Sequence, residues 1–165
     1  MSLNAVKLDQ NGKPELLEGS GEIFQTSGHA AKATLLLPGP KKTDTVKGRI
    51  WVTDFQIIFY ADDQLDFDED DTVHPLNSLE IPFADLQTLV LSKVLFGPDN
   101  LTLTYTPEPD FVIEAMFSIK DKKSMKEVYT AMKQWKEESI RQEKITEAIK
   151  ELAKEGYAVY NGPKR

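Results

Sequence analysis

The side chains that could take part in chemistry are mainly charged ones, and they occur in groups. Four lysines flank the early predicted strands: Lys32, Lys41, Lys42 and Lys47. A lysine ammonium group can hold a phosphate as a compact point charge. These lysines are therefore candidates for holding a phosphate group, although the formal net charge of -7 for the whole chain weighs against it.

The run 62–71 consists largely of Asp and Glu. It lacks the glycine and the ligand spacing of an EF-hand loop, so we expect a solvated loop rather than a calcium site. Its charge could instead attract a basic protein, through Asp66, Asp68, Glu69 and Asp70. The two histidines, at 29 and 74, are too few and too isolated for a metal centre. We expect no metal and no cofactor.

The usual sets of catalytic groups are missing from the sequence. No serine sits in a nucleophile elbow, and no glycine-rich loop resembles a phosphate cradle. The chain has no cysteine and two histidines, so thiol and serine–histidine chemistry has few candidates. The pairs of carboxylates lie in the acidic run, where solvent screens them. We therefore expect a protein that is not an enzyme.

Composition indicates one ordinary globular domain. The chain has 165 residues, of which 40% are hydrophobic and 28% are charged. Its acidic balance argues against nucleic acid as a partner, because proteins that bind nucleic acids usually carry a basic patch. The first residues have no apolar core long enough for a signal peptide, and no segment has the length and hydropathy of a membrane span. We expect a cytoplasmic or nuclear protein that is neither secreted nor transmembrane.

Short apolar and alternating runs predict about seven strands. The stretch 47–60 predicts a hairpin with a tight turn at Thr53-Asp54, in which the second strand is almost wholly apolar. Ser27-Gly28 is expected to end a strand that begins at Glu22, and the next run is closed by Pro38-Gly39-Pro40. The remaining strands are expected at 33–37, 79–81, 86–95, 101–106 and 111–119.

After Lys120 the apolar period becomes helical. Ser124 and Glu127 fit a capping box, and the stripe that follows would plug the core of the sheet. Its members are Met125, Val128, Met132 and Trp135. A second stripe contains Ile140, Ile145, Ile149 and Leu152, and Gly156 is expected to end the helix. The second stripe is offset from the first, so we expect either a bend near Glu138 or two helices.

These patterns divide the chain into a domain at 1–138, a helical extension at 139–156 and a tail at 157–165. The stripe of the extension needs burial against the flank of the domain, another subunit or a target protein. It is the best candidate surface for a protein partner. Strands followed by one amphipathic helix give the order of a pleckstrin-homology-like fold, a seven-stranded antiparallel barrel or sandwich capped by its C-terminal helix.

The hairpin carries a resemblance to a known family. Gly48-x-Ile-Trp-Val-Thr-x-Phe-x-Ile-Ile-Phe resembles the signature of GRAM domains, a branch of the pleckstrin-homology superfold. The N-terminal segment 1–22 and the turn Val-Leu-Phe-Gly-Pro-Asp-Asn at 94–100 are similar to the WW-domain-binding protein 2 family, particularly its fungal members. The resemblance covers about 1–135 and implies a non-enzymatic adaptor that binds a protein partner and acts in transcriptional regulation.

Two departures limit what this resemblance implies. The family hairpin usually carries Arg where this chain has Gln56, and Asp99 lengthens the turn. The family binds WW domains through Pro-Pro-x-Tyr motifs in a proline-rich tail, and this chain contains no such motif, so WW-domain binding is not expected. Two alternatives stay open: a peripheral membrane module that binds phosphoinositides, and an acidic chaperone resembling the assembly chaperone of spliceosomal Sm proteins, whose partner is basic.

Overall fold

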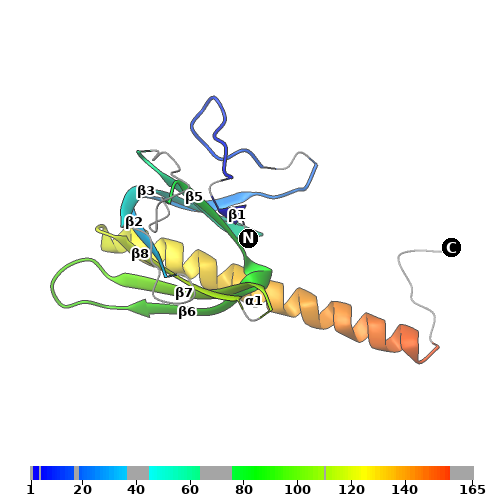
Figure 1. Cartoon of the computed structure of the whole chain (residues 1–165). Helices are drawn as coiled ribbons and strands as arrows, with labels where there is room; N and C mark the ends of the chain where they lie inside the picture. The colour runs from blue at the N-terminus through cyan, green and yellow to red at the C-terminus, as the bar shows by residue number, and fades with distance from the viewer. Residues whose placement is uncertain are drawn as a thin grey trace.

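The computed structural model is a mostly antiparallel β-sheet followed by one long helix that packs on it (Figure 1). It describes residues 2–3, 5–16, 19–36, 45–63, 76–109 and 111–156. The predicted fold class is confirmed, because the strand order is consistent with a pleckstrin-homology-like fold. The elements are β1 Ser2–Leu3, β2 Phe24–Leu36, β3 Val46–Thr53, β4 Gln56–Ala61, β5 Ser78–Pro82, the 3-10 helix η1 Phe83–Asp85, β6 Leu86–Ser92, β7 Asn100–Glu108, β8 Phe111–Ile119 and α1 Lys122–Lys154.

The long strand β2 joins the two halves of the sheet, whose order is β1-β5-β4-β3-β2-β8-β7-β6. Its first part pairs with β3 and its last part pairs with β8, with a register shift between Gly28 and Ala31. The predicted break at Ser27-Gly28 is therefore wrong. A Cβ at Gly28 would lie 2.8 Å from Ile119 Cδ1 and 3.1 Å from Ile50 Cγ2, so glycine is needed for close packing within a continuous strand.

The predicted hairpin is confirmed as β3–β4, which lies between β5 and β2 in the sheet, although its turn lies at Asp54-Phe55, one residue later than expected. Apolar side chains of both strands are buried, Ile50, Ile57 and Phe59 among them. Gly48 faces Ala61 in the register, and a Cβ on it would collide with the carbonyl oxygen of Tyr60. This close backbone approach explains why glycine begins the sequence motif.

Helix α1 closes the open side of the sheet. Its residues Met125, Val128 and Met132 are fully buried in the core, and Trp135 packs at the edge of that core. The predicted cap at Ser124 is wrong: Asp121 is the N-cap, and its carboxylate accepts from the backbone N–H of Lys123 and from Ser124 Oγ. Gly156, with a φ of 87°, lies just past the C-terminal end, as predicted.

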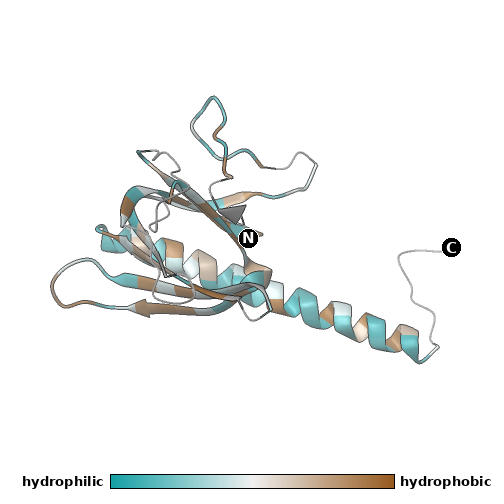
Figure 2. Ribbon diagram, viewed as in Figure 1, coloured by the Kyte–Doolittle hydropathy of each residue, from teal (hydrophilic) through white to brown (hydrophobic). Residues whose placement is uncertain are grey.

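The helix continues past the sheet as one element of 33 residues, so the alternative of two helices is wrong. The two apolar stripes are offset because they lie on different faces of this one helix. The distal residues Ile145, Ile149 and Leu152 face roughly a third of a turn away from the core-facing side, at about 100° per residue. Figure 2 shows brown apolar positions among the teal ones along this projecting part.

The N-terminal residues form a small hairpin against the sheet. Leu8 and Pro14 make an isolated bridge, and Arg49 Nη1 donates to the carbonyl oxygen of Gly12 over 3.1 Å. The guanidinium of Arg49 also stacks over the ring of Trp51 at 5.1 Å. Among the described residues, no helix combines the length and hydropathy needed to cross a bilayer.

Candidate functional site

Lysines from two adjacent strands lie opposite each other at one end of the sheet. In the β2–β3 register the partner of Lys32 is Lys47, and in the β2–β8 register it is Ser118. Both lysines are exposed. Like charges directly opposite each other on adjacent strands are destabilising. The sheet therefore holds two positive charges side by side in a chain that is acidic overall.

A third lysine completes a basic cavity at this end. The cavity has a volume of about 540 Å³ and is lined by residues of three strands and one loop. Lys120, at the junction of β8 and α1, joins the lysine pair. We call this space the lysine cavity. Its lining residues are Lys32, Lys47, Gly97, Pro98, Ser118 and Lys120.

The lysine cavity has the chemistry of an anion site. Within the described part of the chain, none of its three lysines takes part in an ion pair. Three ammonium groups and the Ser118 hydroxyl can together donate to the oxygens of a phosphorylated ligand. Such a ligand would also remove the repulsion between Lys32 and Lys47.

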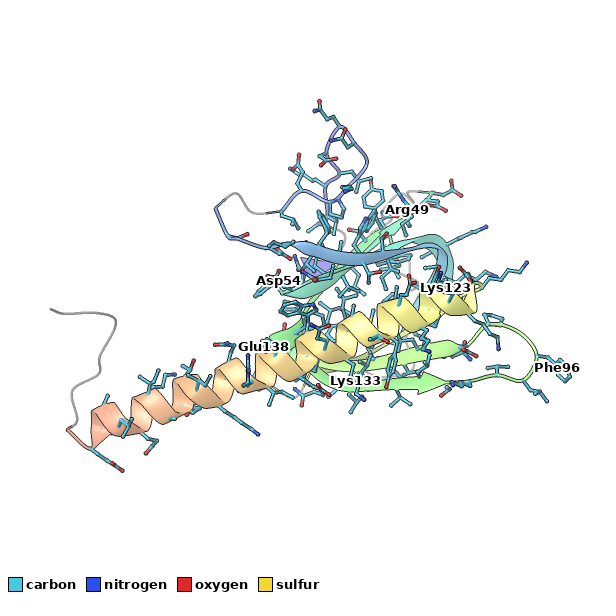
Figure 3. All side chains as sticks on the ribbon, turned by 180° about the vertical axis from the view of Figure 1, so that it is seen from behind. Arg49, Asp54, Phe96, Lys123, Lys133 and Glu138 are labelled. Carbon is cyan, nitrogen blue, oxygen red and sulfur yellow. The ribbon has the colours of Figure 1, made fainter. Side chains whose placement is uncertain are left out.

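A second basic groove lies on the other side of the β6–β7 loop. Its volume is about 430 Å³, and its lining includes Lys93, Lys122 and Lys126 together with Asp99 and Tyr129. Lys122 Nζ lies 3.6 Å from the Asp99 carboxylate, so part of this charge is already neutralised. Figure 3 shows Lys123, which also belongs to the first turn of α1, at the same end of the molecule as Phe96 in the β6–β7 loop.

Two of the three lysines of the cavity, Lys32 and Lys47, were predicted from the sequence. Lys41 and Lys42, the other predicted members, lie outside the described residues. Sequence reasoning missed Lys120 and Ser118, because their contribution depends on how β8 pairs with β2. The only sequence signal was the alternation in β8, which places Ser118 between the buried residues Phe117 and Ile119.

The predicted partner stripe on α1 is exposed. Ile140, Ile145, Ile149 and Leu152 have exposed fractions between 38% and 49%. Ile140 lies about 140° around the helix from Ile145, so three of the four residues share one face. We call Ile145, Ile149 and Leu152 the distal stripe. No described part of the sheet covers it, since all residues from 140 to 156 are exposed.

Carboxylates gather in a different cavity, of about 560 Å³, beside the β3–β4 turn. Its lining includes Glu15, Glu22, Asp54 and Glu80, together with the amide of Gln56. Burial raises the pKa of the Glu80 carboxyl, an effect that a hydrogen bond with Gln56 opposes and the nearby charge of Glu22 increases. Among the described residues, no group of three or more His, Asp or Glu side chains could hold a metal ion.

The remaining predicted candidates belong to the acidic run and to the two histidines. The acidic residues Asp66, Asp68, Glu69 and Asp70 lie outside the described part of the chain, as does His74. The side chain of His29 is likewise not described, although its backbone belongs to β2. The acidic run therefore stays a prediction.

Comparisons with known proteins leave the family open. No family model matches the sequence, and no curated protein matches it. Among solved structures, the chain is similar to the C-terminal domain of an unknown protein from Leishmania infantum, with 11% sequence identity and a TM-score of 0.39. That likeness covers 70% of this chain and 85% of the other. The function must therefore be argued from the residues of this chain.

Proposed function

We propose that this chain is a non-enzymatic binding module of the GRAM type, and that its lysine cavity binds a phosphorylated anion, specifically a phosphoinositide headgroup. The observation that supports this most directly is the pairing of Lys32 with Lys47 across adjacent strands, with Lys120 on the same cavity. The arrangement is unfavourable without a counter-charge. A multivalent phosphate is the ligand class whose charge matches it.

The test is to measure, by calorimetry, how tightly the chain binds a soluble inositol phosphate. The double variant Lys32→Gln/Lys47→Gln should bind at least about tenfold more weakly, because two charge-assisted hydrogen bonds are lost. The matched control is Lys133→Gln/Lys144→Gln, which removes two exposed lysines of α1 outside the lining of the cavity. Binding should also weaken with added salt. Equal affinities for the wild type and the cavity variant would refute the site.

A second proposal concerns the protein partner. The distal stripe lies on a part of α1 that no described barrel residue covers, and a helical apolar face of this kind pairs with another helix. We propose that the partner is a second copy of the chain, in antiparallel orientation. The basis for this choice is the order of charges along one edge of the stripe.

Arg141 and Lys144 lie on that edge near the start of the distal stripe, and Glu151 and Glu155 lie on it near the end. Within one chain Arg141 pairs with Glu138 at 2.7 Å and Glu151 pairs with Lys154 at 3.5 Å, so these two charges would exchange partners when the helices associate. In an antiparallel pair centred near Ala148, the basic end of each helix meets the acidic end of the other. Ile145 then faces Leu152 of the second copy. The small side chain of Ala148 permits close approach at the centre. The contact is short, so association should be weak.

Sedimentation velocity over a range of concentrations tests this pairing. The wild type should self-associate and Ile145→Asp should remain monomeric, because a charge at the stripe opposes burial. Ile140→Asp is the matched control, since Ile140 is on the same helix but off the stripe. Monomeric wild type at high concentration would exclude the second copy as the partner.

The alternative of a chaperone for a basic, Sm-like protein depends on the acidic run 62–71, most of which lies outside the described residues. It stays a prediction, and purification of the chain with its bound proteins from its native host would test it. A role in transcription is proposed only through the GRAM resemblance. Its test is a reporter assay in that host.

A further inference from the structure

The β6–β7 loop exposes two large apolar side chains next to the lysine cavity. Leu95 and Phe96 are each 87% exposed, more than any other large apolar side chain identified as exposed in the described chain. The next two residues, Gly97 and Pro98, line the lysine cavity itself. The apolar tip and the basic cavity therefore form one continuous surface. Figure 3 shows Phe96 at the outermost point of this loop.

The tip is held by contacts at the base of its loop. The carboxylate of Asp99, which is buried, accepts from the backbone N–H of Val94 over 3.1 Å. Lys122 Nζ lies 3.6 Å from the same carboxylate and 3.4 Å from the carbonyl oxygen of Val94. Gly97 has a φ of 111°, a conformation that favours glycine, and it turns the chain back toward β7. These contacts hold the base of the loop in place, so that Leu95 and Phe96 point outward.

Basic side chains flank the loop on both sides. The lysine cavity lies on one side, and the groove with Lys93, Lys122 and Lys126 lies on the other. An apolar tip between two basic surfaces is complementary to a bilayer interface, where acyl chains lie beneath anionic headgroups. A dry protein pocket would match the apolar tip but not the flanking lysines, and bulk water would match the lysines but not the tip.

We propose that Leu95 and Phe96 insert into the interfacial region of a membrane while the lysine cavity holds a phosphorylated lipid headgroup of that membrane. This inference rests on the headgroup binding proposed above. It assigns the loop a separate contribution, since a single signal gives only marginal anchoring and two signals together give stable binding. Burial of the two side chains should strengthen vesicle binding by at least about tenfold.

Nearby carboxylates make this surface selective. Asp62 and Asp63 are exposed after β4, and the backbone N–H of Asp62 donates to the carbonyl oxygen of Lys47. Together with the net charge of -7, they oppose adhesion to a membrane that is merely anionic. We therefore expect vesicles with phosphatidylserine alone to bind poorly, and vesicles with phosphatidylinositol bisphosphate to bind well.

Vesicle sedimentation separates the two contributions. The variant Leu95→Ser/Phe96→Ser should lose about tenfold or more in binding to phosphatidylinositol bisphosphate vesicles, but it should bind soluble inositol trisphosphate as the wild type does. The matched control Ile23→Ser/Val112→Ser removes two exposed apolar side chains. The first lies near the β3–β4 turn and the second near the β7–β8 turn, and we expect no change. Unchanged vesicle binding by the loop variant would overturn the proposal.

A fluorescent label reports insertion directly. The chain has no cysteine, so Phe96→Cys carries a single label that is sensitive to polarity. Its emission should shift to shorter wavelength on binding vesicles, and quenchers attached to the acyl chains should reduce it. The same label on Val112→Cys should not respond. Absence of a shift at position 96 while the protein sediments with vesicles would refute insertion.

The two proposals fail in different ways. If soluble inositol trisphosphate does not bind the wild type, the headgroup site is wrong. The label at position 96 then decides whether the loop inserts without it. If inositol trisphosphate binds but the loop variant binds vesicles normally, the headgroup site stands and the insertion is wrong.

Discussion

At the scale of single residues, Thr53 makes several hydrogen bonds at the turn of the β3–β4 hairpin. Its hydroxyl accepts from the backbone N–H groups of Phe55 and Gln56, over 3.0 and 2.9 Å, and donates to the Glu22 carboxylate over 2.6 Å. Thr53 is fully buried. The hydroxyl therefore satisfies the backbone of the turn by the kind of local bond that shapes tight turns.

We expect Thr53→Val to lower the free energy of unfolding by about 1–3 kcal/mol, because the isosteric side chain leaves these backbone donors without their partner. Urea unfolding at neutral pH measures the change. Thr53→Ser keeps the hydroxyl and should lose much less. Equal losses in both variants would show that the methyl group, rather than the hydroxyl, stabilises the turn.

Glu80 predicts a pH dependence of stability. Burial raises the pKa of its carboxyl above the ordinary value of 4.5 in the folded chain, so the folded state binds more protons than the unfolded state above that pH. The stability contribution of this residue therefore falls as the pH rises through the interval between 4.5 and the raised pKa, and then stays constant. Glu80→Gln removes this effect.

The expected result is that Glu80→Gln gains stability relative to the wild type as the pH rises from about 4 to 7. Calorimetric melting temperatures at several pH values measure the difference. The exposed Glu137→Gln is the control and should track the wild type. A difference that is independent of pH would contradict the assigned cause.

At the scale of elements, α1 uses two faces for two purposes. Met132 is fully buried under the sheet, whereas Ile149, on the same helix, is exposed on the distal stripe. Met132→Ala should lower the free energy of unfolding by about 2–5 kcal/mol, because it leaves a cavity. Ile149→Ala should change it by less than about 0.5 kcal/mol.

Chemical denaturation at low protein concentration tests this pair, since self-association would otherwise stabilise the helix. The two substitutions are well matched in size, so the contrast reports burial. A large loss for Ile149→Ala in the monomer would mean that its face packs against the chain's own barrel.

The elements also show what the sequence could and could not predict. Alternation and helical spacing predicted the β3–β4 hairpin, most strands and the C-terminal helix, because these depend on local spacing. The capping pattern placed the N-cap three residues too late, at Ser124 instead of Asp121. The continuous strand β2 was missed, because Gly28 is set by close packing against Ile50 and Ile119, which lie far away in sequence. For the same reason the sequence predicted only Lys32 and Lys47 of the lysine cavity. Lys120 reaches it through pairing of β8 with β2 that no local pattern encodes.

At the scale of the whole molecule, the proposed surfaces lie at opposite ends. Figures 1 and 3 show the β6–β7 loop and the first turn of α1 at one end, and the C-terminal part of α1 projecting from the other. In an antiparallel pair of helices, the two β-sheets lie at opposite ends of the dimer. Their lysine cavities and apolar tips then face away from each other.

This geometry predicts that the chain clusters vesicles. A dimer with outward-facing membrane surfaces bridges two bilayers, so vesicles containing phosphatidylinositol bisphosphate should aggregate at protein concentrations where the chain self-associates. Dynamic light scattering measures the aggregation. Ile145→Asp should abolish clustering and keep vesicle binding, whereas Ile140→Asp should behave as the wild type does.

The loop variant Leu95→Ser/Phe96→Ser distinguishes membrane binding at one end from self-association at the other. It should still self-associate but fail to cluster vesicles. Clustering by a monomeric Ile145→Asp protein would show that each chain bridges membranes by another route, and would contradict the antiparallel arrangement. Binding without clustering by a dimeric wild type would instead place both membrane surfaces on one side. That result would require a parallel rather than an antiparallel pairing of the distal stripe.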